Sequence, residues 1–199
     1  MIEPELIFDE PSHTYTVTHA DGRIVTLPSV TQIVRQFVPG WRVADWYLTR
    51  GKAVHRAVEL HATGKLDWST VHPEIEPRVR AAITACEQLG IKANSALTES
   101  RQWSKQHQFA GTIDWLGYSA KHGTLLVDWK SSVDPAANQP QMGAYAILYG
   151  GNLSAVIVEL RDDGTPKFYW MTAREVRTAS HIFLHMRSVY GHLQEHGKI

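Results

Sequence analysis

Hydrophobic and polar residues alternate with the period of β-strands through much of the second half of the chain. A loosely alternating stretch at 95–103 and two largely apolar runs at 109–119 and 123–130 predict three successive strands, and the polar turn between the last two predicts a hairpin. A run of good helix formers follows at 139–150, and a buried strand follows it at 153–160. Because a strand–helix–strand step joins parallel neighbours, this β-β-β-α-β order predicts an α/β or α+β fold with a mixed central sheet.

The other segments predict a small hairpin, one further strand and four helices. Residues 166–171 form a strand that pairs with 153–160 across the turn Asp162-Asp163-Gly164. At the N-terminus, 13–18 and 23–27 flank an Ala-Asp-Gly turn and predict a hairpin. The predicted helices run from the N-cap Ser29 to Pro39-Gly40, from 50 to 63 before Gly64, from 77 to 89 before Gly90, and from 173 to 196.

The chain has no repeats, low-complexity tracts or linkers, so we expect a single domain over residues 1–199. Within it, 1–92 holds the N-terminal hairpin and helices, 93–172 the core sheet, and 173–199 the C-terminal helix.

Three charged residues interrupt the two strands of the central hairpin. A turn centred on Lys121 places Asp114 opposite Asp128, and the period of two puts Lys130 on the same face. The opposite face is then a continuous apolar layer of Phe109, Ile113, Trp115, Leu125, Val127 and Trp129. Two interpretations of the charged face remain open. Opposed carboxylates are destabilising unless a cation compensates, and a divalent ion would do so well; alternatively, this is a solvated face with an incidental ion pair.

Further polar residues are ambiguous when taken singly. His55 lies near the apolar side of its helix, and Gln141 and Tyr145 share a helix face at i, i+4 spacing. Glu99 alternates with Arg101 on the strand before the hairpin. A set of histidines also falls near one face of the last helix, where a solvated stripe is favoured over a metal site: His181, His185, His192 and His196. Phosphate-loop, dinucleotide and nucleophile-elbow motifs are absent from the sequence, and Cys86 shows no sign of activation.

Composition narrows the classes of function. The formal net charge is zero, which argues against a protein that coats duplex DNA by bulk electrostatics but allows a local basic groove. The single cysteine cannot form an internal disulfide, and the chain shows neither a membrane-spanning apolar run nor a signal peptide. We therefore expect a cytoplasmic protein, in a bacterial or phage-infected cell, with no membrane partner.

Five short motifs occur in a distinctive order: GKAVH, TES, AGTID, VDWKSS and QMGAY. In this order the sequence resembles the RecB-type branch of the PD-(D/E)XK nuclease superfamily. The matching positions are His55, Gly111 with Asp114, Asp128 with Lys130, and Gln141 with Tyr145. The N-terminal HTYTV and LPSVTQIV also look like the beginning of phage exonucleases and mitochondrial genome maintenance exonucleases. Two positions depart from the pattern: Ile113 replaces its proline, and its second acid is Asp128, not glutamate.

The resemblance implies a restriction-endonuclease-like core and a Mg²⁺- or Mn²⁺-dependent deoxyribonuclease. It assigns catalysis to Asp114, Asp128 and Lys130, and the metal to His55, the two aspartates and the backbone carbonyl of Trp129. A histidine ligand predicts good activity with Mn²⁺ as well as Mg²⁺. The residues that it implies for contacts with the substrate are Gln141, Tyr145, Lys52 and Arg56. Glu99 is implied as a supporting group or as the ligand of a second metal.

The expected substrate is DNA, either single-stranded or at its ends, in recombination, repair or phage DNA processing. Trp41, Trp46 and Tyr47 are candidates for a base-stacking platform, with core packing as the favoured alternative. Processivity would require a homo-oligomer, a channel, or a single-strand annealing or recombination partner. A structure-selective endonuclease and a non-catalytic DNA- or protein-binding module remain as alternatives. Polarity, strand preference and RNA as substrate stay open.

Overall fold

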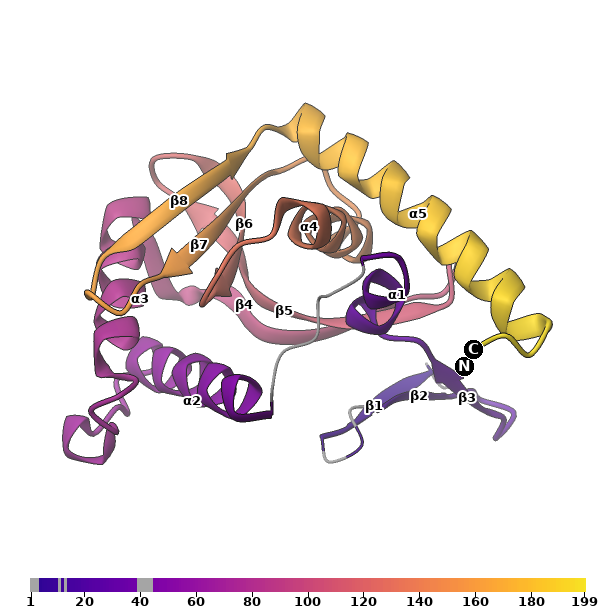
Figure 1. Cartoon of the computed structure of the whole chain (residues 1–199), viewed down its shortest axis with the longest axis horizontal. Coiled ribbons are helices and arrows are strands. Elements are labelled where there is room, and N and C mark those ends of the chain that lie inside the picture. Colours follow the sequence, from indigo (N-terminus) through magenta and orange to yellow (C-terminus); the bar gives the residue numbers. More distant parts are fainter. Residues whose placement is uncertain (1–3, 11, 13, 39–44) are drawn as a thin grey trace.

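A computed structural model describes residues 4–10, 12, 14–38 and 45–199 of the chain (Figure 1). Its centre is a five-stranded sheet with the strand order β4-β5-β6-β7-β8. These strands are Ile91–Ser104, Phe109–Ser119, Gly123–Lys130, Ser154–Leu160 and Pro166–Met171. The β6–β7 pair is parallel and the other pairs are antiparallel, as expected where helix α4 (Pro135–Tyr149) connects β6 to β7. The predicted mixed sheet is therefore confirmed.

The central hairpin has the register that the turn predicts. Its ladder runs from Ser119↔Gly123 to Trp115↔Val127, so it is centred on Lys121. Asp114 and Asp128 each lie one position beyond the Trp115↔Val127 pair, on the side away from the turn. The charged residues therefore lie where β5 and β6 cease to pair.

Helices cover both faces of the sheet (Figure 1). Residues of α1 (Val30–Phe37), α4 and α5 (Ala173–Glu195) form a core against one face. Residues of α2 (Asp45–Ala62) and α3 (Glu76–Leu89) form a second core against the other, and the short 3-10 helix η1 (Trp68–Thr70) connects these two helices. The side of the hairpin that bears Asp128 is thus buried beneath α4 instead of being a solvated face.

The predicted apolar layer is wrong at two positions. Trp115, Leu125, Val127 and Trp129 pack with α2 and α3, but Phe109 and Ile113 belong to the opposite core. These two residues lie beyond the last β5–β6 pair, where Glu99 on β4 has a left-handed φ of 48°. Beyond that point β5 pairs with β4 alone, so the hairpin register does not determine which core its side chains enter.

The N-terminal region is a three-stranded sheet and not a simple hairpin. β2 (Thr14–Thr18) and β3 (Ile24–Leu27) pair around the predicted turn, and β1 (Glu5–Asp9), which was not predicted, pairs with β2. The predicted first residue, His13, lies outside the described residues. Tyr15, Val17 and Leu27 pack on Ala110 of β5, so this sheet lies against the central one.

Local sequence explains most helix ends. Ser29 caps α1 in a reciprocal capping box with Gln32, and Gly90 ends α3 with a φ of 65°. Helix α2 begins at Asp45 and α4 at Pro135, both earlier than predicted. The predicted end of α1 at Pro39-Gly40 lies outside the described residues. Among the described helices, none combines the length and the apolar character needed to cross a bilayer.

Candidate metal centre

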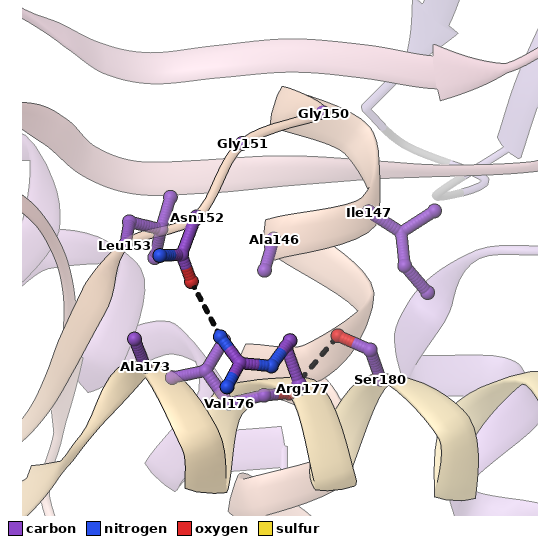
Figure 2. Close-up of a pocket in the computed structure, with 10 residues that line it drawn as sticks. All are labelled: Ala146, Ile147, Gly150, Gly151, Asn152, Leu153, Ala173, Val176, Arg177 and Ser180. Atoms are coloured by element: carbon purple, nitrogen blue, oxygen red, sulfur yellow. Dashed lines mark hydrogen bonds between the residues drawn. The ribbon is translucent and has the colours of Figure 1, made fainter.

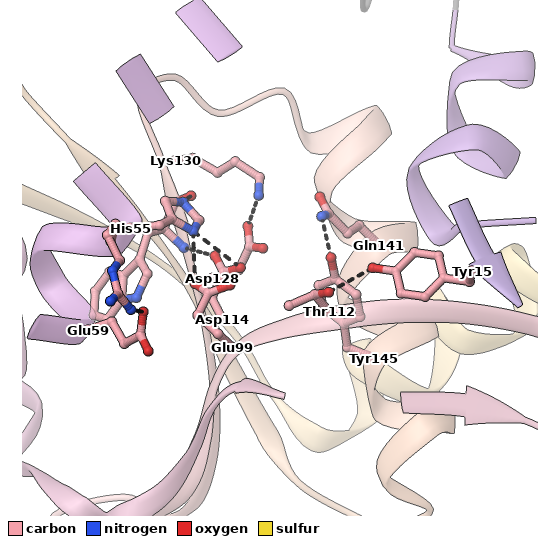
Figure 3. A network of polar contacts seen from close by, with 12 residues as sticks. Tyr15, His55, Glu59, Glu99, Thr112, Asp114, Asp128, Lys130, Gln141 and Tyr145 are labelled. Atoms are coloured by element: carbon pink, nitrogen blue, oxygen red, sulfur yellow. Dashed lines mark hydrogen bonds and ion pairs between the residues drawn. The ribbon is translucent and has the colours of Figure 1, made fainter. Parts of the chain in front are cut away.

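Three side chains from separate elements converge near the end of the central hairpin (Figure 3). His55 on α2, Glu99 on β4 and Asp114 on β5 each place a ligand atom within 4.8 Å of the others. His55 Nδ1 lies 3.2 Å from Glu99 Oε1 and 3.6 Å from Asp114 Oδ1. Imidazole nitrogen and carboxylate oxygen are both ligands for divalent cations, so this donor set fits a metal ion.

The backbone of Trp129 contacts both Asp114 and His55. Its N–H donates to Asp114 Oδ2 at 2.9 Å, and its carbonyl oxygen lies 3.3 Å from His55 Nε2. The Asp114 side chain therefore takes a hydrogen bond from β6 just where the backbone ladder ends. This contact fixes the Asp114 carboxylate at the end of the ladder, whereas the Trp129 carbonyl, the fourth ligand predicted for the site, faces Nε2 and not Nδ1 of His55.

Asp128 lies next to this cluster but is paired differently. Its Oδ2 is 2.5 Å from Lys130 Nζ, while Oδ1 has no hydrogen-bond partner among the described residues. The Asp128 side chain is fully buried. Since buried carboxylates normally satisfy their acceptor atoms, Oδ1 is an unsatisfied position that a cation or its water would fill.

Burial and mutual charge shift the pKa values of these groups. Burial alone would lower the pKa of His55, but the Asp114 and Glu99 carboxylates raise it to about 9. Burial raises the pKa of Asp128 to about 6 against the opposing effect of Lys130, and Asp114 adds to the rise. The pKa of Lys130 is raised, because the attraction of Asp128 and Asp114 outweighs its burial. Without a metal, His55 and Lys130 are thus the cations that balance the carboxylates.

Gln141 and Tyr145 lie on the face of α4 turned toward the cluster. Gln141 Nε2 donates to the Tyr145 hydroxyl at 2.8 Å, and both side chains are buried. The Tyr145 ring fits against β5 because Gly111 has no side chain; a Cβ there would be 3.1 Å from Tyr145 Cε1. Burial, together with the charge of Asp128, raises the pKa of Tyr145 well above its ordinary value, so its hydroxyl stays protonated.

The other predicted contacts to substrate are less closely placed. Lys52 and Arg56 are exposed on α2. Lys52 Nζ lies 4.0 Å from Glu10 Oε1, and Arg56 Nη1 lies 2.5 Å from Glu59 Oε2. Trp41 and the side chains of Trp46 and Tyr47 lie outside the described residues. A pocket of about 20 Å³ beside His55 is lined by further basic groups, including Arg50, Arg78 and Lys130.

Other candidates of the sequence do not form sites. The three candidate histidines of α5 and His196, which follows the helix, are exposed. The described residues contain no second metal-ligand cluster of three. Burial raises the pKa of the Cys86 thiol to about 11, which makes it a poor nucleophile. A pocket of about 350 Å³ between α4 and α5 is lined largely by apolar and small residues, with Arg177 donating to Asn152 at its edge (Figure 2).

Sequence reasoning placed Glu99 below the other candidates, yet it is one of the three clustered side chains. Its position on the strand before the hairpin was the available signal. The left-handed backbone of Glu99 could not be predicted from the sequence, because a glutamate normally avoids this conformation.

Comparison of the sequence with protein-family models and with curated proteins gives no match.

Proposed function

We propose that this protein is a metal-dependent nuclease that hydrolyses phosphodiester bonds of DNA, acting from strand ends. The observation that carries the proposal is the meeting of His55, Glu99 and Asp114 next to the ion pair between the buried Asp128 and the half-buried Lys130. Acidic and imidazole donors beside an ammonium group suit a cation and a phosphate held side by side. The β-β-β-α-β order and the resemblance of the motifs support a restriction-endonuclease-like core for this chemistry.

In this proposal His55, Glu99 and Asp114 would hold the metal, because their donor atoms already converge at His55 Nδ1, and Asp128 would complete its surroundings. The Trp129 carbonyl faces the other ring nitrogen, Nε2, so it would reach the same ion only after a change in the position of the imidazole. The bound ion would supply a Lewis acid and a metal-bound water of lowered pKa near neutral pH. Asp128 Oδ1, which has no hydrogen-bond partner among the described residues, would be available to the ion or to its water.

Lys130 stabilises negative charge that develops on the phosphate. Its raised pKa keeps the ammonium protonated at neutral pH, which favours charge stabilisation over general-base catalysis. Gln141 and Tyr145 lie beyond Lys130 and contribute neutral hydrogen bonds to the nucleic-acid backbone.

The test is a cleavage assay with purified protein on end-labelled DNA, single- and double-stranded, linear and circular. Each substrate is incubated with Mg²⁺, Mn²⁺ or EDTA. We expect loss of linear DNA with either metal, no loss in EDTA, and no product with Asp128→Ala or Lys130→Ala. Asp163→Ala and Lys167→Ala, both on exposed positions around the β7–β8 turn, are the matched controls and should cleave normally.

The outcomes separate the candidate functions. Cleavage of circles would indicate an endonuclease, and binding of DNA without cleavage in any metal would indicate a binding module. Activity with Mg²⁺ but not with Mn²⁺ would contradict His55 as a metal ligand. A recombination or single-strand annealing partner, and a cytoplasmic location, belong to the same proposal.

A further inference from the structure

The N-terminal sheet contacts the central sheet at Thr112, close to the metal cluster. The Tyr15 hydroxyl on β2 lies 2.7 Å from Thr112 Oγ1 on β5 (Figure 3). Thr112 is two residues before Asp114, and its side chain is half-buried. A phenol is a stronger donor than an aliphatic hydroxyl, and burial raises the pKa of Tyr15, so the phenol keeps its proton. With Tyr15 as the donor, Thr112 directs its own proton elsewhere.

A cation lies directly beside Thr112. Arg101 on β4 is the cross-strand partner of Thr112, so the two side chains extend from the same face of the sheet. The Arg101 guanidinium lies over the ring of Phe8, 4.9 Å from its centroid, and Phe8 in turn contacts Tyr15 at a ring-centroid distance of 4.5 Å. Arg101 is exposed, and no carboxylate of a described residue lies within 4 Å of it.

The arrangement repeats along the two strands. Glu99 and Asp114 hold neighbouring positions on β4 and β5, and Arg101 and Thr112 hold the next positions of the same parity. Along β5, the two residues from Thr112 to Asp114 span about 6.8 Å, which is similar to the separation of successive phosphates in an extended nucleic-acid strand. One pair is acidic and fits a cation, whereas the next is a guanidinium with a hydroxyl donor and fits an anion.

We propose that Arg101 and Thr112 form a phosphate-binding site for the nucleotide adjacent to the cleaved bond, and that Phe8 and Tyr15 orient them. This inference rests on the proposed nuclease function and extends it, because it makes the N-terminal sheet part of the substrate-binding surface. Arg101 supplies charge, Thr112 supplies a neutral hydrogen bond, and Tyr15 is a positioning residue that acts through Thr112.

The two contacts are separable by their salt dependence. Binding of a fluorescein-labelled single-stranded oligonucleotide is measured by anisotropy in EDTA over a series of NaCl concentrations. Each phosphate charge neutralised on a single strand contributes about 0.7 to the slope of log K against log salt concentration. We expect Arg101→Gln to weaken binding about tenfold and to reduce the slope by about 0.7. Thr112→Val should weaken binding about threefold with the slope unchanged.

Steady-state cleavage gives a second measurement. Tyr15→Phe keeps the packed ring but removes the hydroxyl, so KM should rise about twofold to threefold while kcat stays the same. The matched controls are Arg174→Gln on the exposed start of α5 and Thr124→Val on β6, which should leave KM and the salt slope unchanged. Thermal unfolding of each variant verifies that it is folded.

The outcomes distinguish this inference from the function on which it rests. If wild type cleaves DNA while Arg101→Gln and Thr112→Val bind and cleave as wild type does, the phosphate site is refuted and the nuclease stands. If wild type neither binds nor cleaves, the proposed function fails and the phosphate site fails with it. Weaker binding by Arg101→Gln with an unchanged salt slope would also contradict the proposal, because it would show that Arg101 does not neutralise a phosphate charge.

Discussion

The Asp114 carboxylate accepts a hydrogen bond from the Trp129 backbone N–H at 2.9 Å, at the point where the β5–β6 ladder ends. A side chain thus satisfies a backbone donor of β6 in place of a backbone carbonyl. The same carboxylate presents its second oxygen to His55 at 3.6 Å. One residue thereby joins the local structure of the sheet to the candidate metal centre.

Replacing Asp114 should separate these two roles. Asp114→Asn keeps an acceptor for the Trp129 N–H but removes a charge that stabilises protonated His55, so we expect it to lose less stability than Asp114→Ala, with Mn²⁺ binding strongly reduced in calorimetric titration. Asp114→Ala leaves a buried N–H unsatisfied, and its free energy of unfolding in urea should fall by about 1–3 kcal/mol. Equal stability of the two variants in EDTA would contradict the structural role of this hydrogen bond.

His55 should make the stability of the metal-free protein depend on pH. Its pKa is about 9 in the folded protein and returns to its ordinary value of 6.5 on unfolding. The folded state therefore binds the proton more tightly, and the resulting stabilisation is complete below pH 6.5 and lost as the pH rises through 9. The full loss is on the order of 3 kcal/mol, since the pKa rises from 6.5 to about 9 and one pKa unit corresponds to about 1.4 kcal/mol.

The measurement is urea unfolding in EDTA between pH 6.5 and 9, compared with His55→Gln. The variant lacks the titrating group, so its free energy of unfolding should change less over this range. Parallel curves for wild type and variant would show that the imidazole is not stabilised as a cation by Asp114 and Glu99.

The ion pair between the buried Asp128 and Lys130 predicts that removing Lys130 lowers the free energy of unfolding by an amount that depends on the protonation of Asp128. Lys130→Met leaves the Asp128 carboxylate without its counter-charge, and removing one partner of a buried pair costs about 3–5 kcal/mol. Because burial already raises the pKa of Asp128 to about 6, this cost should be largest near pH 8 and smaller near pH 5, where the carboxyl group is neutral.

Chemical denaturation of the metal-free variants at both pH values tests this. The double variant Asp128→Asn, Lys130→Met should recover much of the stability that Lys130→Met loses at pH 8. The control Lys167→Met, at an exposed position of β8, should cost little stability at either pH. A loss from Lys130→Met that is the same at pH 5 and pH 8 would mean that the Asp128 charge is not its cause.

The sequence allowed prediction of those parts of the fold that depend on local chemistry. The turn around Lys121 determined the hairpin register, and Ser29 and Gly90 marked helix ends correctly. The mixed sheet followed from the alternation of elements, because a helix between two strands requires a crossover. Asp114 and Asp128 were found because charges are unexpected in strands that are otherwise apolar.

The remaining features depend on long-range contacts that periodicity does not encode. Ile113 enters the core beneath α4, and Glu99, with its left-handed backbone, lies next to His55, 44 residues away. The contact between Tyr15 and Thr112 joins residues 97 positions apart and depends on how the N-terminal sheet docks. β1 is short and at the edge of that sheet, so pairing with β2 stabilises a segment whose own pattern is weak.

Gly111 should control the position of the Tyr145 ring. A Cβ at residue 111 would lie 3.0 Å from Val30 Cγ2 and 3.1 Å from Tyr145 Cε1, both of which are buried. Gly111→Ala must therefore displace one of these side chains, and overpacking of this kind typically costs about 1–3 kcal/mol. Gly51→Ala is the matched control, since a Cβ there meets no atom within 4 Å.

We expect Gly111→Ala to raise KM for DNA more than it lowers kcat, because Tyr145 would move away from the substrate while the metal ligands stay in place. Thermal unfolding and steady-state cleavage of both alanine variants measure the two effects. If Gly111→Ala equals Gly51→Ala in stability and KM, then the close packing of the Tyr145 ring on β5 does not position a group that binds substrate.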